Sequence, residues 1–117
     1  MEISNIDNKI GSIMLDPEVG IGLARLVKGD NISFHVALVE NRIKLHYHRY
    51  RDEVYYIVKG KGLIRVGEEK RDVREGDVIL IPKGKPHSLE NKGKEPLVLV
   101  FASAPPFAPE EDREMLE

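Results

Sequence analysis

The chain has 117 residues, a length that suits one domain with a core of its own and is too short for two. Hydrophobic residues make up 41% of the chain and charged residues 32%, which is typical of globular proteins and argues against disorder. The formal net charge is -2, and basic residues are scattered among acidic ones, so the charge gives no reason to expect a nucleic-acid partner.

The chain contains no cysteine and no long apolar run, and both absences narrow the class of protein. Without cysteine, the chain forms no disulfide and offers no thiolate, so any metal site must use nitrogen and oxygen ligands. The longest clean apolar run, residues 78–81, is too short to cross a bilayer, and the first four residues lack the basic start of a signal peptide. We therefore predict a cytoplasmic protein that does not act at a membrane.

Short runs rich in Val, Ile, Leu, Tyr and Phe follow one another along the chain, separated by turn residues, and this pattern predicts a β-sandwich or β-barrel. The predicted strands cover residues 12–15, 21–27, 32–39, 43–48, 53–59, 62–66, 70–73, 77–81, 87–91 and 97–102. The one helix-like segment begins at Pro109, where proline in the first turn and the acidic residues after it favour a helix start. We expect a single helical turn there.

Three of the four histidines and one glutamate stand at spacings that can bring them to one metal ion. His46 and His48 are two residues apart on a predicted strand, so their side chains point to the same side. A four-residue connection leads to Glu53, and a hairpin there would bring its carboxylate alongside both imidazoles. His87 follows a rigid Pro-Lys-Gly-Lys-Pro turn that would present it from a neighbouring strand. Such a set leaves coordination positions open and suits one divalent ion of iron, manganese, nickel, zinc or cobalt.

The residues around this set resemble the two signature motifs of the cupin superfamily. The first motif contains His-x-His, Glu and a closing Gly, and the second contains Gly, Pro-x-Gly, His and Asn. The matching residues are His46, His48, Glu53 and Gly60 in the first motif, and Gly76, Pro82, Gly84, His87 and Asn91 in the second. One departure is Glu40, which stands where the family has its opening Gly. The neighbouring Asn41 tolerates a left-handed turn, so we interpret the departure as a changed turn and not as a lost site.

The resemblance covers roughly residues 32–103 and implies an all-β fold, an antiparallel double-stranded β-helix of jelly-roll type. Residues 1–117 would form a single domain, with His46, His48, Glu53 and His87 holding the metal inside the barrel. Similar single-domain cupins are commonly homodimers, and strands within residues 12–27 would extend the sheet or form the dimer interface. Residues 104–117 would be a tail along the surface, with a lid over the barrel mouth as the alternative.

Strand alternation extends the site beyond the metal ligands. Tyr55 shares the face of Glu53, and its hydroxyl either supports a ligand of the metal or finds backbone while the ring fills the barrel. Lys44 shares the face of His46 and either attracts an anion or reaches water. His35 either faces the cavity or is a structural histidine. Tyr55 and His35 are the only candidates for catalytic residues, and the charged connection 49–52 is expected to be solvated.

Two functions are consistent with an open metal site. The first is a mononuclear metalloenzyme acting on a small polar or sugar-like molecule, by dioxygenase chemistry or by isomerisation like that of mannose-6-phosphate isomerase. The second is a binding module that holds a small molecule or sugar at the metal without turnover. No organic cofactor is expected, and no helix-turn-helix is present that would make the chain a gene regulator.

Overall fold

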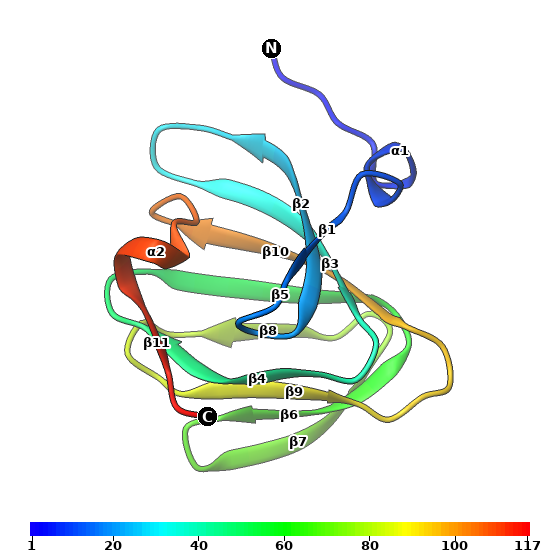
Figure 1. Cartoon of the computed structure of the whole chain (residues 1–117), viewed down its shortest axis with the longest axis vertical. Helices are drawn as coiled ribbons and strands as arrows, with labels where there is room; N and C mark the ends of the chain where they lie inside the picture. Colours follow the sequence, from blue (N-terminus) through cyan, green and yellow to red (C-terminus); the bar gives the residue numbers. More distant parts are fainter.

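The computed structural model describes residues 1–117 and is almost entirely antiparallel β-structure (Figure 1). Its strands are β1 (Met14–Asp16), β2 (Ile21–Lys28), β3 (Ser33–Val39), β4 (Arg42–His48), β5 (Asp52–Lys59), β6 (Lys61–Val66), β7 (Glu69–Arg74), β8 (Val78–Ile81), β9 (His87–Asn91), β10 (Leu97–Ala104) and β11 (Arg113–Met115). Each predicted strand is present with bounds within two residues of those expected, so the all-β fold class is confirmed. The helices α1 (Ile6–Ile10) and α2 (Pro109–Asp112) are far too short to serve as membrane spans.

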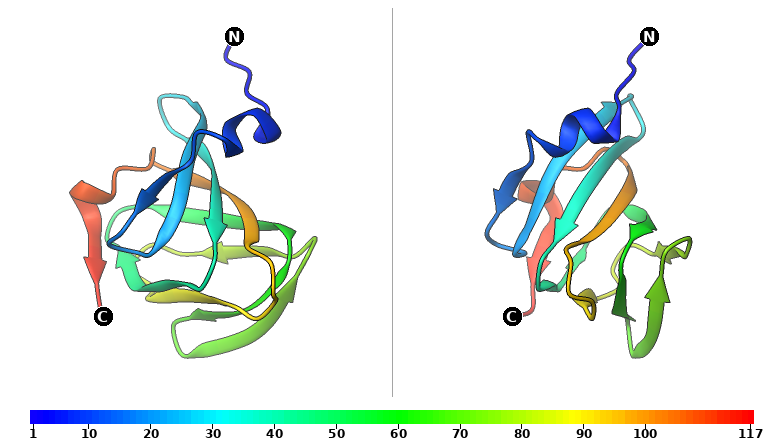
Figure 2. Two further views of the ribbon diagram at one scale, coloured as in Figure 1. Left: turned by 45° about the vertical axis from the view of Figure 1, so that its right-hand side comes forward. Right: turned by 90° about the vertical axis from the view of Figure 1, so that its right-hand side faces the viewer.

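The strands form two sheets that face each other across the interior (Figure 2). The six-stranded sheet has the order β1-β2-β3-β10-β5-β8, and the five-stranded sheet has the order β11-β4-β9-β6-β7. Most neighbours in these sheets are distant in the chain. This is the strand order that positions β4 beside β9 and places β5 opposite them.

The connection between β4 and β5 corrects the hairpin expected at this point. β4 pairs with β9 and β11, whereas β5 pairs with β10 and β8. Residues 49–51 therefore carry the chain from one sheet to the other. As a result, Glu53 approaches the histidines from the opposite sheet and not from a paired strand.

One hydrophobic cluster of 14 buried residues fills the space between the sheets. Its members come from both sides, such as Ile57 of β5 and Leu89 of β9, which are both fully buried. On β5 every second residue faces inward, so Glu53 and Tyr55 lie in the interior with Ile57. Each fully buried side chain of this kind contributes about 1.5–3 kcal/mol, and together they hold the ligand-bearing strands in place.

Helix α1, which the sequence did not predict, covers part of the outer face of the six-stranded sheet. The side chain of Asn5 caps it by accepting a hydrogen bond from the Asp7 N–H at 2.9 Å. Ile6 and Ile10 pack on a small apolar cluster formed by β2, β3 and β10. A helix of five residues is too short for its apolar period to be recognised in a sequence.

The outer face of β5 and β8 remains uncovered. Its exposed apolar side chains include Val54, Tyr56, Val78 and Leu80. Contiguous apolar surface of this kind is typical of a protein–protein interface. The homodimer expected from the resemblance stays a prediction.

The C-terminal segment belongs to the fold and does not lie loosely on its surface. Helix α2 is the predicted single turn, and β11 then pairs with β4, placing Arg113 opposite His48. Asp112, the last residue of α2, has no exposed surface. The expectation of a surface tail is therefore wrong, because this segment forms a strand beside the one that carries two of the predicted ligands.

Candidate metal centre

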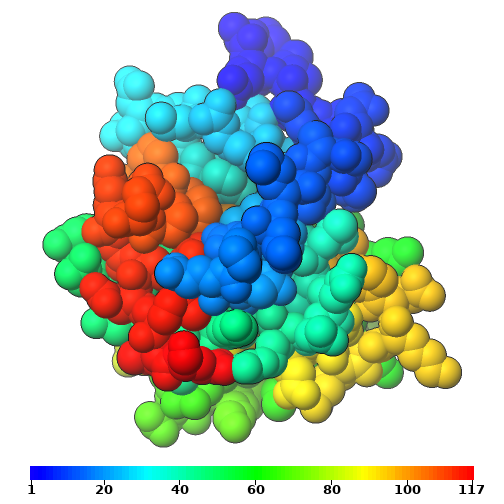
Figure 3. Space-filling model, in the orientation of Figure 1, coloured from blue at the N-terminus to red at the C-terminus, as the bar shows by residue number.

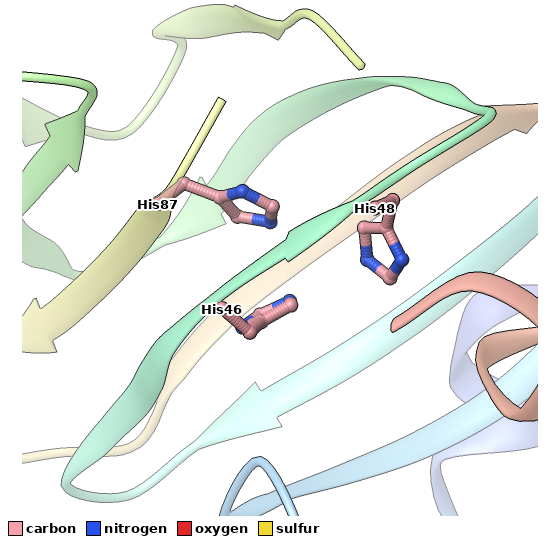
Figure 4. Close-up of side chains that lie close together, drawn as sticks. All are labelled: His46, His48 and His87. Atoms are coloured by element: carbon pink, nitrogen blue, oxygen red, sulfur yellow. The ribbon is translucent and has the colours of Figure 1, made fainter. Parts of the chain in front are cut away.

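The four predicted ligands come together inside the barrel. His46 and His48 come from β4, His87 from β9 and Glu53 from β5, and all four are 1–3% exposed. One ligand nitrogen of each histidine lies within 4.8 Å of the other two, and the three rings lie close together in Figure 4. Glu53 completes the set, since its Oε1 lies 3.5 Å from Nε2 of His48 and 3.5 Å from Nε2 of His87.

Backbone carbonyls hold two of the imidazoles in place. Nδ1 of His46 donates to the Lys44 carbonyl at 2.6 Å, and Nδ1 of His87 donates to the Lys85 carbonyl at 2.9 Å. A carbonyl oxygen only accepts, so the ring proton must be on Nδ1. The lone pair of Nε2 is therefore available in both residues, which is how metal-binding histidines are usually oriented.

Burial keeps the imidazoles of His46 and His48 neutral. Desolvation lowers the pKa of His46 to about 2, and the neighbouring His87 adds to this shift. Burial is also the main reason why the pKa of His48 is lowered, although the nearby Glu53 opposes the shift. Neutral imidazole is the form that binds a metal, so the site does not have to lose protons from these two rings near pH 7.

Two buried atoms of this set, Oε1 of Glu53 and Nε2 of His87, have no hydrogen-bond partner in the protein. A buried polar atom left unpaired costs about 1–3 kcal/mol. Donor atoms bonded to one ion at about 2.0–2.2 Å lie roughly 2.8–3.6 Å from their neighbours at octahedral or tetrahedral angles. The 3.5 Å separations of Oε1 from the two Nε2 atoms fall in that range. The donor set therefore fits a divalent ion, and its chemistry does not favour one of the five metals over the others.

Behind His48 lies a buried ion pair that the sequence did not reveal. Oδ1 of Asp112 accepts from Nδ1 of His48 at 3.3 Å, and Nε of Arg51 donates to the two Asp112 oxygens at 2.9 and 2.8 Å. Arg51 also donates to the carbonyls of Pro106 and Ala108. The Arg51 side chain is 2% exposed, so the expectation that the connection 49–52 is solvated is wrong at this residue. The pair ties the C-terminal segment to the ring of a predicted ligand.

The carboxylate of Asp112 stays charged in this position. Burial opposes the charged form, but hydrogen bonds from Arg51 and from the Tyr50 N–H hold the pKa of Asp112 below its ordinary value. A charged Asp112 accepts the Nδ1 proton of His48. It therefore leaves Nε2 of His48 free to bind a metal, as the carbonyls do for the other two rings.

Two residues of the motifs act through the backbone. Gly84 has a φ of +80°, and its N–H donates to the His48 carbonyl at 2.7 Å, which joins the second-motif turn to β4. The Asn91 amide donates to the carbonyls of Val39 and Glu40 at 3.0 Å each. No residue other than glycine has a positive φ, so the turn at Glu40 needs no left-handed backbone. The departure from the family pattern is thus a changed turn.

A cavity of about 20 Å³ adjoins the histidines. This is room for roughly one water molecule. Most of its wall is hydrophobic, and its polar lining consists of His46, His48, Glu53, Tyr55 and Arg113. Burial, and secondarily the charge of Glu53, raises the pKa of Tyr55 well above its ordinary value, so its hydroxyl stays protonated and can donate a hydrogen bond.

Lys44 does not line the cavity, contrary to the expectation from strand alternation. The pairing of β4 with β9 shifts register between Ile43 and His46. Such a bulge adds a residue to one strand and reverses the side on which the following residues lie. Ile43 therefore lines the cavity in place of Lys44.

His35 also lies outside the residues that line the cavity. Its ring stacks on Phe101 with ring centres 4.8 Å apart, and it meets Phe107 edge-on at 5.1 Å. Its Nε2 forms a hydrogen bond of 2.7 Å with the Ser33 hydroxyl. These contacts are those of a buried structural histidine.

The metal-free protein is expected to lose stability below pH 6.5, in part because of His35. Burial, as the main cause, lowers the pKa of His35 from 6.5 to about 4. Between these values the unfolded chain binds a proton that the folded protein does not, so this contribution is complete above pH 6.5 and is lost as the pH falls towards 4. Its full size is at most about 3 kcal/mol. In urea unfolding with a chelator present, the free energies of unfolding of wild type and His35→Phe should run parallel above pH 6.5. Below pH 6.5 the value for wild type should fall more steeply than that for His35→Phe. Curves that stay parallel throughout would contradict the shift.

The chain is similar in sequence and in fold to known proteins. An uncharacterized protein of Methanocaldococcus jannaschii is 37% identical over 112 residues, which span 93% of this chain and 85% of that protein. The crystal structure of a Thermus thermophilus protein superposes with a TM-score of 0.76 at 26% identity, covering 92% of this chain and 100% of that chain. Over a shorter stretch of 55 residues, the chain is 34% identical to the oxalate-binding protein of Thermotoga maritima, which covers 47% of this chain and 46% of that protein.

The family comparison covers both motifs. The model of the cupin domain matches residues 33–103, a segment that runs from β3 to β10 and contains all four predicted ligands. This segment is well over half of the chain. The protein therefore belongs to the cupin family.

Proposed function

We propose that this protein holds one divalent metal ion through His46, His48, Glu53 and His87, and that the ion binds a small carboxylate of about the size of oxalate. The observation that carries the metal site is the pair of unpaired buried atoms, Oε1 of Glu53 and Nε2 of His87, 3.5 Å apart. A shared cation satisfies both atoms at once. No other group in the protein does so.

The small cavity supports a small ligand. With a volume of about 20 Å³, it offers far less space than a sugar phosphate would occupy. As it stands, the cavity admits one oxygen atom of a ligand at the metal, and the rest of a small carboxylate requires the cavity wall to open. The similarity to a protein named for oxalate binding supports a carboxylate as this ligand.

The residues that line the cavity favour ligand binding. They also favour reactions that do not need a side chain of the protein to accept a proton. A divalent ion supplies a Lewis acid that polarises an oxygen ligand. The apolar wall excludes water, and Tyr55 can donate a hydrogen bond to the ligand. Apart from the metal ligands, the cavity has no group that could take a proton. Isomerisation of a sugar phosphate is therefore the weaker of the two enzymatic hypotheses, while reaction of the bound acid with dioxygen would not need such a base.

The proposal is tested by measuring metal content and ligand binding together. The protein, purified with its own metal and also reloaded with iron, manganese, nickel, zinc or cobalt, should bind close to one ion per chain. Isothermal titration with oxalate should show binding to the metal-loaded protein and none to the metal-free protein. His48→Ala should lose both. A metal content near zero after every reloading, or oxalate binding that does not depend on metal, would overturn the proposal; oxygen consumption or product formation would separate an enzyme from a binding module.

A further inference from the structure

Arg113 is a buried cation in the wall of the cavity. Its side chain is 4% exposed, and it lines the cavity together with His46, His48 and Glu53. The pairing of β11 with β4 places it there, because Arg113 lies opposite His48. Neither signature motif contains this residue, and no pattern in the sequence singles it out.

The buried Nε–H of the Arg113 guanidinium has no partner in the protein. Nη2 donates to Oδ2 of Asp16 at 2.8 Å, and Nη1 donates to Oε1 of Glu18 at 2.9 Å and to Oδ1 of Asp16 at 3.4 Å. Nε is buried and makes no hydrogen bond. Arginine does not lose its charge in proteins, so this donor is present at every relevant pH. Because the Arg113 side chain lines the cavity, a molecule bound there can supply the acceptor.

The partners of Arg113 also fix its orientation. Asp16 ends β1 and Glu18 follows it, so both acids come from the N-terminal part of the chain. They bind the two terminal nitrogens, and Phe107 packs on the guanidinium with its ring centre 5.9 Å from Cζ. The guanidinium is rigid and planar, so holding its terminal nitrogens also fixes the direction of Nε–H. In Figure 3 the N-terminal segment (blue) and the C-terminal segment (red) meet on one face of the molecule.

We propose that Nε–H of Arg113 donates a hydrogen bond to an anionic oxygen of the small carboxylate, and that this bond makes the site select anionic over neutral ligands. The inference rests on the proposed function, since the ligand is the one that the metal would hold. A hydrogen bond to a charged partner is the stronger kind, and here it forms in a cavity from which water is largely excluded. Arg113 would then act on specificity and not as a metal ligand.

The test compares Arg113→Met and Arg113→Lys with wild type in the zinc-loaded protein. Both variants lack the Nε–H. Because Arg113→Lys keeps a positive charge beside Asp16 and Glu18, it is expected to fold even if Arg113→Met does not. Oxalate affinity, measured by isothermal titration, should fall about 10- to 100-fold in both variants. Zinc affinity should stay within about threefold of wild type. Arg71→Met removes an equal charge at an exposed position and should leave oxalate affinity unchanged.

A direct readout accompanies the affinities. The Nε–H resonance of Arg113 in the nitrogen-15 NMR spectrum of the zinc-loaded protein should shift downfield on addition of oxalate. An unmoved resonance, together with oxalate affinities in the variants equal to wild type, would overturn the role of Arg113 and leave a buried water as the partner of Nε. If wild type itself binds no metal, the proposed function fails instead, so the two failures are distinguishable.

Discussion

Glu53→Gln is expected to make the protein more stable in the absence of metal and to lower its metal affinity. Oε1 of Glu53 lies 3.5 Å from the Nε2 atoms of His48 and His87, and without a cation between them these atoms are acceptors that face one another with no donor. A glutamine amide can donate to one of these nitrogens. We expect the free energy of unfolding to rise by about 1–3 kcal/mol, the usual cost of a buried unpaired group.

The same substitution removes a charged ligand, so metal affinity should fall by at least about tenfold. Urea unfolding with and without a chelator, and competition titration with zinc, measure the two effects. Glu68→Gln, at an exposed position, is the matched control and should change neither quantity. A Glu53→Gln protein that is less stable than wild type in the presence of chelator would show that the four side chains are not arranged for a cation.

Asp112→Ala should have the largest effect outside the ligand set. It removes the acceptor of the His48 ring and leaves Arg51 as an unpaired charge in the interior. Loss of one partner of a buried ion pair typically costs 3–5 kcal/mol, so unfolding should shift to much lower urea. Loss of a group that orients a metal ligand typically lowers metal affinity 10- to 100-fold.

The two consequences of Asp112→Ala can be separated by a double substitution. Arg51→Met combined with Asp112→Leu removes both charges, so stability should recover in part, whereas metal affinity should stay low because His48 has lost its acceptor. Glu111→Ala changes the adjacent exposed acid and should leave both properties as in wild type. Full recovery of metal affinity in the double variant would show that Asp112 contributes only to folding.

The strands and the ligand set could be predicted because short-range rules determine them. Alternation along a strand places His46 and His48 on one side, and motif spacing supplies Glu53 and His87. Whether the strands that carry His48 and Glu53 pair with each other was harder to predict, since a four-residue connection can close a hairpin or cross to a second sheet. Only the complete strand order distinguishes the two.

Residues that act on the site from the C-terminal segment could not be predicted for a different reason. Asp112 and Arg113 stand in a charged stretch of a kind that is usually solvated, and their burial depends on Arg51 and Asp16, which are about 60 and about 100 residues away. Likewise, the bulge that removes Lys44 from the cavity leaves no mark in the alternation of residue types. Long-range pairing of charges has no local signature in one sequence.

The shortness of β11 has a consequence for the speed at which the site exchanges its contents. Asp112 ends the short helix α2 and Arg113 begins β11, a strand of three residues at the edge of a sheet, next to the C-terminus. Such strands open locally far more often than the whole domain unfolds. A cavity of about 20 Å³ offers no wide passage of its own, so molecules would enter and leave when this strand frays. The residence time of a ligand would then follow the local stability of the last few residues as much as the strength of its bonds to the metal.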